Sequence, residues 1–149
     1  MLFKSLNRDE PERVFIVVEN NEGATIIKDQ TVAMDFSTEI DGVKSRDMDT
    51  GELFAFQGIA DAAISDNDFG LVHIYGYRST SIVFQTNTSQ AAGAALVPTA
   101  AADYLQSVAT TLASNTTITL QPSFAVLGES IASSSASATI SAKLFVRGL

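Results

Sequence analysis

The chain contains no cysteine and no tryptophan, and it has a single histidine, His73. The lack of cysteine rules out disulfides, thiolate metal sites and cysteine nucleophiles. A histidine-based metal site needs further ligands, and a catalytic triad needs positioned partners, which the pattern around His73 does not identify. We therefore expect His73 to be a packed or interface residue, and we expect no enzyme activity and no cofactor.

Long apolar runs are also missing. No run approaches the roughly 18 residues that a membrane-spanning helix requires. The first residues, MLFKSLNRDEPER, lack the apolar core of a signal peptide. We expect no membrane partner and no secretion through a cleaved signal.

Basic residues are scarce: nine Lys and Arg stand against 17 Asp and Glu, which gives a net charge of −8. A nucleic-acid surface needs a basic stripe, so we expect no nucleic-acid partner. Fifteen of the acidic residues lie in positions 1–75, whereas Ser79 to Ala142 contain only Asp103 and Glu129 as charged residues. This weakly charged half, rich in Ala, Ser and Thr, favours a surface that contacts protein partners over a surface that faces only solvent.

Two acidic segments have a faint likeness to calcium loops, Asp47–Gly51 and Asp66–Asp68. Both lack the twelve-residue ligand spacing and the terminal glutamate of such loops. Turns stabilised by Asp and Asn side chains explain them without a metal ion. Paired carboxylates of a glycosidase remain an open alternative, although the chain offers few aromatic residues for a sugar platform.

At 149 residues the chain is long enough for one domain with its own core. Met1–Glu12 has no usable periodicity and is expected to be an extended N-terminal arm or a frayed terminus. Residues 13–149 then form a single β-domain, because short β-branched and aromatic runs alternate with turn signals. The expected strands are Arg13–Glu19, Ala24–Ile27, Thr31–Phe36, Thr38–Ile40, Val43–Arg46, Leu53–Gln57, Phe69–Tyr75, Arg78–Gln85, Gly93–Pro98, Ile118–Leu120, Ser123–Leu127 and Ala138–Val146.

The central stretch Gly58–Gly76 organises this pattern. Its strand Phe69–Tyr75 is followed almost at once by Arg78–Gln85, so a bend or bulge at Gly76 would let one long strand serve two parts of a curved sheet. Thr99–Leu112 is ambiguous, because it reads either as an Ala-rich helix or as a strand at Tyr104–Val108. The fold class expected from these patterns is all-β, a small barrel or sandwich.

The sequence also carries a weak internal echo. Phe56–Ala60 followed by Gly70–Gly76 is similar to Val126–Ser130 followed by Ile140–Gly148, at an offset close to 70 residues. Two related β-units that close one barrel would explain the echo. Independent convergence on strand, turn and strand explains it equally well.

Several segments together resemble the head-decoration, or capsid cement, proteins of tailed bacteriophages. They are Phe56–Ala60 (FQGIA), Gly70–Gly76 (GLVHIYG), Gly93–Pro98 (GAALVP), Tyr104–Ser107 (YLQS), Val126–Ser130 (VLGES) and the closing strand. The resemblance covers about residues 24–149 and lies in the pattern more than in any diagnostic motif. It implies a β-tulip-like or jelly-roll-like β-barrel core, and it favours the strand for Thr99–Leu112.

The resemblance further implies a structural virion protein that is made in the host cytoplasm and binds the outer capsid surface. There it would cement neighbouring subunits of the major capsid protein, commonly as a homotrimer. The residues we assign to capsid binding lie in the arm: Phe3, Lys4, Leu6 and Arg8. Those assigned to a trimer interface are His73, Tyr75, Tyr77, Ser133 and Ser135. The alternative is a receptor- or glycan-binding β-module on a virion tail or spike, and a hydrolase is the least supported class.

Overall fold

A computed structural model describes residues 12–37, 42–48, 55–85, 89–98, 104–107, 124–133 and 138–147. Within these ranges every regular element is a β-strand, and none of them forms a helix that could cross a membrane. The all-β fold expected from the sequence is therefore confirmed. The strands are β1 (Arg13–Asn20), β2 (Thr31–Met34), β3 (Lys44–Asp47), β4 (Phe56–Ala60), β5 (Phe69–Gln85), β6 (Ala95–Pro98), β7 (Leu105–Ser107), β8 (Ala125–Leu127) and β9 (Ala138–Arg147).

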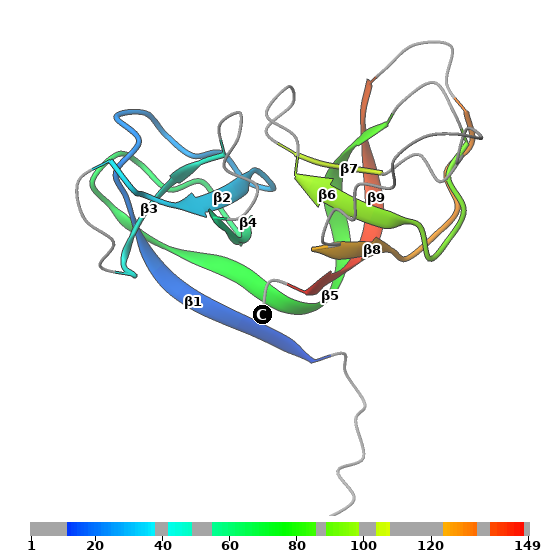
Figure 1. Ribbon diagram of the computed structural model, residues 1–149, viewed down its shortest axis with the longest axis horizontal. Coiled ribbons are helices and arrows are strands. Elements are labelled where there is room, and N and C mark those ends of the chain that lie inside the picture. Colours follow the sequence, from blue (N-terminus) through cyan, green and yellow to red (C-terminus); the bar gives the residue numbers. More distant parts are fainter. Residues whose placement is uncertain are drawn as a thin grey trace, which may run out of the picture.

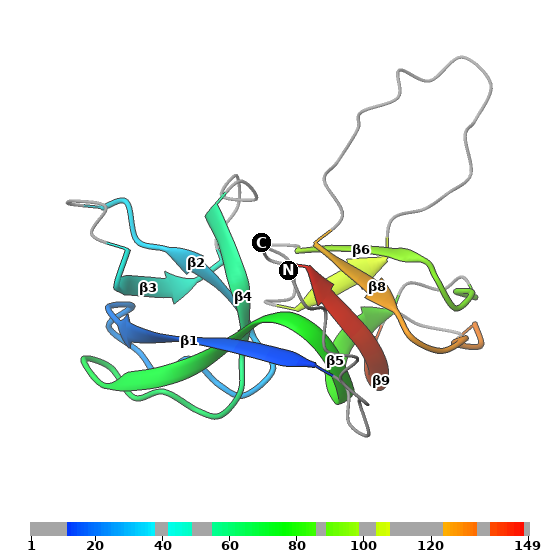
Figure 2. The ribbon, with the colours of Figure 1, turned by 90° about the horizontal axis from the view of Figure 1, so that it is seen from below.

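These strands close two rings that share β5 (Figures 1 and 2). Hydrogen-bonded neighbours in the first ring follow the order β1, β3, β2, β4, β5 and return to β1. In the second ring the order is β5, β7, β6, β8, β9 and back to β5. Two related units were predicted to close one barrel. Instead, each unit closes a ring of its own, because β5 is long enough to serve both.

The two rings repeat one pairing scheme. In each ring, the strands that come first and third along the chain are neighbours and run parallel: β1 with β3, and β5 with β7. All the other neighbouring strands are antiparallel. Each ring also carries one isolated bridge between its connections, Ile26 with Ile64 and Gln90 with Ile131. Gly58 and Gly128, about 70 positions apart, each face the backbone carbonyl of a later strand. The weak echo in the sequence thus corresponds to a structural repeat.

Strand β5 turns from one ring into the other at Gly76, which has a φ of +112°. A side chain at this position would collide with the carbonyl oxygen of Glu12. Tyr77 donates its backbone N–H to the same Glu12 oxygen over 3.2 Å. Only glycine accepts both this backbone conformation and this close approach. The prediction that one long strand passes through Gly76 and serves two parts of the sheet is confirmed.

Two clusters of buried apolar side chains hold the rings. One lies within the first ring and contains Val18, Ile26, Val32, Ala60, Ile64, Val72 and Ile74. The other joins the second ring to the β2 and β4 side of the first, through Ala33, Met48, Ala55, Phe56, Ile59, Val83, Leu96, Leu105, Ala125, Leu127, Ala142, Leu144 and Val146. Because this larger cluster takes residues from both rings, the rings pack against each other as one body.

Two segments differ in secondary structure from what their local sequence predicted. Within Thr99–Leu112, the helix alternative is wrong for Leu105–Ser107, which form β7. This short strand pairs with β5 on one side and with β6 on the other, and these backbone bonds outweigh the helix preference of the neighbouring alanines. The strand expected over Ala24–Ile27 is reduced to the bridge at Ile26. The expected strands Thr38–Ile40 and Ile118–Leu120 lie outside the described residues.

Candidate functional site

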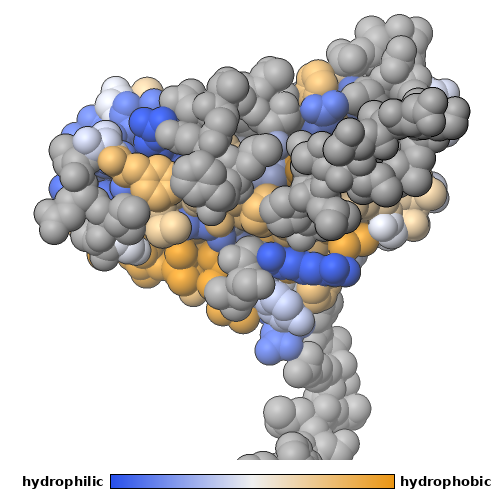
Figure 3. Space-filling model, in the orientation of Figure 1, coloured by the Kyte–Doolittle hydropathy of each residue, from blue (hydrophilic) through white to orange (hydrophobic). Residues whose placement is uncertain are grey.

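Apolar side chains are exposed on the outer surface of the first ring, where β1 lies beside β5. Val17, Leu71 and Phe69 are 60%, 47% and 64% exposed. Val17 lies directly opposite Leu71 across the two strands, and Phe69 lies opposite Glu19. Figure 3 shows apolar residues along this side of the molecule. We call Val17, Phe69 and Leu71 the apolar face.

The alternation of strand residues explains why this face exists. Val18 and Val72 are buried in the first ring, so their neighbours Val17 and Leu71 point outward. Burying a side chain of this size is worth about 1.5–3 kcal/mol. A cluster of such side chains left in water is typical of a surface that binds a partner.

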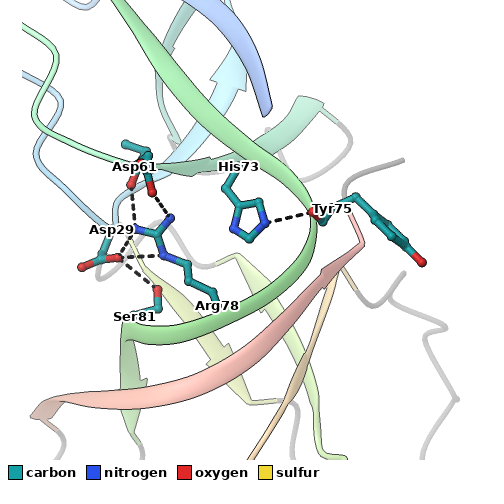
Figure 4. A network of polar contacts seen from close by, with 7 residues as sticks. Asp29, Asp61, His73, Tyr75, Arg78 and Ser81 are labelled. Atoms are coloured by element: carbon teal, nitrogen blue, oxygen red, sulfur yellow. Dashed lines mark hydrogen bonds and ion pairs between the residues drawn. The ribbon is translucent and has the colours of Figure 1, made fainter. Parts of the chain in front are cut away.

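A buried ionic cluster lies where the two rings meet (Figure 4). Arg78 donates from Nη2 and Nε to Asp29 Oδ1 over 2.6 and 3.1 Å, from Nη1 to Asp61 Oδ1 over 2.9 Å, and from Nη2 to the Ala60 carbonyl over 3.2 Å. Ser81 Oγ donates to the same Asp29 oxygen over 3.3 Å. These bonds take up most N–H groups of the guanidinium, so few donors are left for a substrate. We call Arg78, Asp29, Asp61 and Ser81 the clasp, because their contacts connect the two rings.

The clasp depends on an irregularity in β5. The pairing of β5 with β9 shifts between Arg78 and Ser81, so both side chains point to Asp29 although they are three positions apart. Asp29 itself has a φ of +71° and lies two residues before the start of β2. The side chains of Arg78 and Asp29 are each only 7% exposed. Removing one partner of such a buried ion pair strongly destabilises the fold, because the other charge stays buried without compensation.

His73 is fully buried beside this clasp, so the trimer interface predicted for it does not match its position. Its ring stacks on Phe15 at 4.9 Å between centroids, and Nε2 lies 2.9 Å from the Tyr75 carbonyl. Nδ1 is buried and has no hydrogen-bond partner among the residues that the structure describes. Burial, and after it the positive charge of Arg78, lowers the pKa of His73 below its ordinary value. The neutral imidazole is therefore a packing element of the junction.

The structure does not bring the other predicted interface residues together. Tyr75 and Tyr77 lie half-buried on β5 at the junction, with Tyr75 edge-to-face against Phe145 at 5.2 Å. Ser133 is exposed in the connection from β8 to β9. The trimer remains a prediction. Ser135 and the arm residues Phe3, Lys4, Leu6 and Arg8 lie outside the described residues.

No model of a known protein family matches the sequence, and no curated protein matches it. The function must therefore be inferred from the geometry and chemistry of the chain.

The acidic turn at Asp66–Asp68 has the hydrogen bonds of a structural turn. Asp66 Oδ1 accepts the backbone N–H of Gly23 over 2.8 Å, and Asp66 Oδ2 accepts from the Asn67 amide over 2.7 Å. Asn67 has a φ of +61°, which Asn tolerates better than most residues. In the described part of the chain, no group of three or more His, Asp and Glu side chains could hold a metal ion. Of the other acidic segment, Asp49–Gly51 lie outside the described residues.

Sequence reasoning missed the apolar face and the clasp, although each left a signal. Both β1 and the first half of β5 are apolar on two faces, and two adjacent strands at the border of a small ring cannot bury both faces. Arg78 stands at the edge of a segment almost free of charge. A lone cation before such a segment is a candidate for a buried ion pair. The partners Asp29 and Asp61 are distant in sequence and could not have been identified.

Proposed function

We propose that this protein is a structural virion protein that binds the outer surface of a bacteriophage capsid and cements neighbouring major capsid subunits. The main support is the apolar face of Val17, Leu71 and Phe69, which a rigid pair of strands presents to a partner. Its burial against the shell would supply several kcal/mol for each bound copy, because each large apolar side chain contributes about 1.5–3 kcal/mol. Many copies on one shell make such modest contacts effective.

Two further features support this function over catalysis. The guanidinium of Arg78 uses most of its N–H donors within the chain, on Asp29 and Asp61. The segments that resemble capsid cement proteins include the strands β4, β6 and β7, most of β8 and the first half of β5. The resemblance therefore concerns the framework of both rings, which suits a protein whose task is mechanical.

The test is binding of the purified protein to undecorated phage shells. We expect stoichiometric binding and a higher disruption temperature of the shells. The double variant Phe69→Ser with Leu71→Ser should stay folded, since both side chains are exposed, and should lose most of the binding. Ile27→Ser is the matched control, because Ile27 is 46% exposed outside the apolar face.

Two results would contradict the proposal. Absence of both shell binding and shell stabilisation would remove it altogether. Equal loss of binding in Ile27→Ser and in the face variant would remove the apolar face as the contact. A specific hit on a glycan array without shell binding would support a receptor- or glycan-binding module in its place.

A further inference from the structure

Two acidic side chains lie at one end of the apolar face. Asp66 and Asp68 are exposed in the turn that leads directly into Phe69 at the start of β5, and we call them the acidic end. Neither carboxylate has an ion-pair partner among the described residues. Glu19, opposite Phe69, adds little to this negative charge, because Lys44 lies opposite it on β3. A partner that fits this surface therefore needs apolar side chains with a positive charge beside them.

The N-terminal segment of this chain has that composition. Met1–Arg8 (MLFKSLNR) contains Leu2, Phe3 and Leu6, two cations and no acidic residue, in a chain whose net charge is −8. Because it is tethered to the fold, its effective concentration near the face is on the order of millimolar. A second copy in dilute solution does not reach such a concentration, so the segment of the same chain is the favoured occupant.

The segment starts close enough to reach the face. The Glu12 carbonyl accepts the Tyr77 N–H over 3.2 Å, so the chain that precedes Glu12 starts beside Gly76. Leu71 lies five positions from Gly76 along β5, a distance of about 17 Å. The nine residues from Glu12 to Phe3 span at most about 30 Å, which covers this distance and leaves length for one turn.

The order of the residues fits this path. The chain has to turn back once before it can run over the face, and Asn7–Pro11 (NRDEP) is rich in residues that favour turns. Phe3 and Lys4 then lie on the far part of the path, toward the acidic end. Arg8 is only four positions from Glu12, about 13 Å of chain, so it stays near the junction of the rings.

We propose that Met1–Arg8 binds the apolar face of its own chain in the free protein. Phe3 packs against the apolar face, and Lys4 lies near the acidic end. The contact covers apolar side chains that would otherwise promote association of free copies. On a shell, the capsid surface would displace the segment, so that both the face and the arm become available for binding. This inference goes beyond the proposed function, because it concerns the free protein and needs no shell.

The first test is a disulfide trap in the full chain, which has no native cysteine. Phe3→Cys combined with Leu71→Cys should form a disulfide within one chain under mild oxidation. The matched control is Phe3→Cys with Ser141→Cys. Ser141 is exposed on β9, five positions from Val146, which lies opposite Gly76. It is therefore about as far from the start of the segment as Leu71 is, but on the second ring.

Non-reducing electrophoresis and peptide mapping measure the rate of closure in the two pairs. We expect the pair on the apolar face to close about tenfold faster than the control, because binding raises the local concentration of the thiol. Equal rates overturn the proposal. Disulfide-linked dimers in place of closed monomers also overturn it, since they would assign the face to the segment of a second copy.

The second test reverses charges in the Phe3→Cys and Leu71→Cys background. Lys4→Glu should slow closure about fivefold, because an attraction to the acidic end becomes a repulsion. Arg8→Glu is the matched control and should change the rate less than about twofold, because position 8 cannot reach the acidic end. Screening should remove the difference between the two variants at about 1 M salt. Equal effects of both substitutions, or a difference that persists in salt, overturn the proposal.

The third test needs no cysteine. Phe3→Ser with Leu6→Ser should release the segment and raise the fluorescence of a hydrophobic dye severalfold. The same two substitutions in the Phe69→Ser and Leu71→Ser background should give no increase, because the face is then no longer apolar. Circular dichroism checks that each variant keeps its fold. An unchanged dye signal in the first variant overturns the proposal.

These experiments use the free protein, so they are independent of capsid binding. A chain that closes as described and binds no shell would keep this inference and end the proposed function. Shell binding without preferred closure at Leu71 would keep the proposed function and end this inference.

Discussion

Arg78 and Asp29 lie 49 positions apart in the sequence, and their Nη2 and Oδ1 atoms are 2.6 Å apart in the junction between the rings. Arg78 belongs to the part of β5 that pairs with β9, whereas Asp29 precedes β2 of the first ring. Their contact, together with Asp61, connects the two rings through charge as well as through apolar packing.

Arg78→Met should destabilise the protein by about 3–5 kcal/mol, because it leaves the Asp29 carboxylate buried without its cation. The free energy of unfolding from urea titration measures this loss. Arg147→Met is the matched control, since Arg147 is exposed at the end of β9, and it should cost less than about 0.5 kcal/mol. Equal effects of the two substitutions would show that the clasp has no special role.

Gly76→Ala should cost about 3 kcal/mol or more, since a β-carbon there meets the Glu12 carbonyl in addition to adopting a positive φ. Gly42→Ala is the control, because Gly42 has a φ of +76° with no atom within 4 Å of an added β-carbon. That control isolates the backbone conformation and should cost about 1 kcal/mol. If the two variants had the same midpoint in urea, the close approach at the junction would be refuted.

Acid should weaken the fold through His73. Its pKa in the folded state is lowered, so the unfolded chain takes up the proton more readily as the pH falls below about 6.5. Stability is fully present above that pH and should fall by up to about 1.4 kcal/mol between pH 7.5 and pH 5.5. No other histidine contributes, since His73 is the only one in the chain. Asp35 does not contribute in this pH range either, because hydrogen bonds from Ser37 lower its pKa.

Urea midpoints of the wild type and of His73→Phe at the two pH values test this dependence. The variant should be insensitive to pH within this window, because it has no titrating imidazole. A wild type that is equally stable at both values would contradict a neutral, buried His73.

Deletion of residues 1–11 should leave the fold intact and weaken shell binding. All described strand pairings lie outside this segment, which contains Phe3, Lys4, Leu6 and Arg8. Thermal unfolding measures the first expectation and shell sedimentation the second. Unchanged shell binding would mean that the arm takes no part in the contact.

The strands were accessible to prediction because their signals are local. Residue type and spacing account for the β-branched run of β1, for the special role of Gly76, and for the alternation of Ile140, Ala142, Leu144 and Val146 in β9. The helix alternative for Leu105–Ser107 failed because the pairing of β7 with β5 and β6 is set by residues far along the chain.

The sequence by itself determined that the protein is built from short strands, that these echo one another along the chain, and that chemistry based on cysteine is excluded. These properties depend on composition and on periods of a few residues. Only the tertiary structure decided that the strands close two rings around β5, that Arg78 meets Asp29 and Asp61, and that Val17 and Leu71 face outward. Ring closure and burial depend on contacts between distant segments, and the energies of such contacts are not encoded in any local stretch.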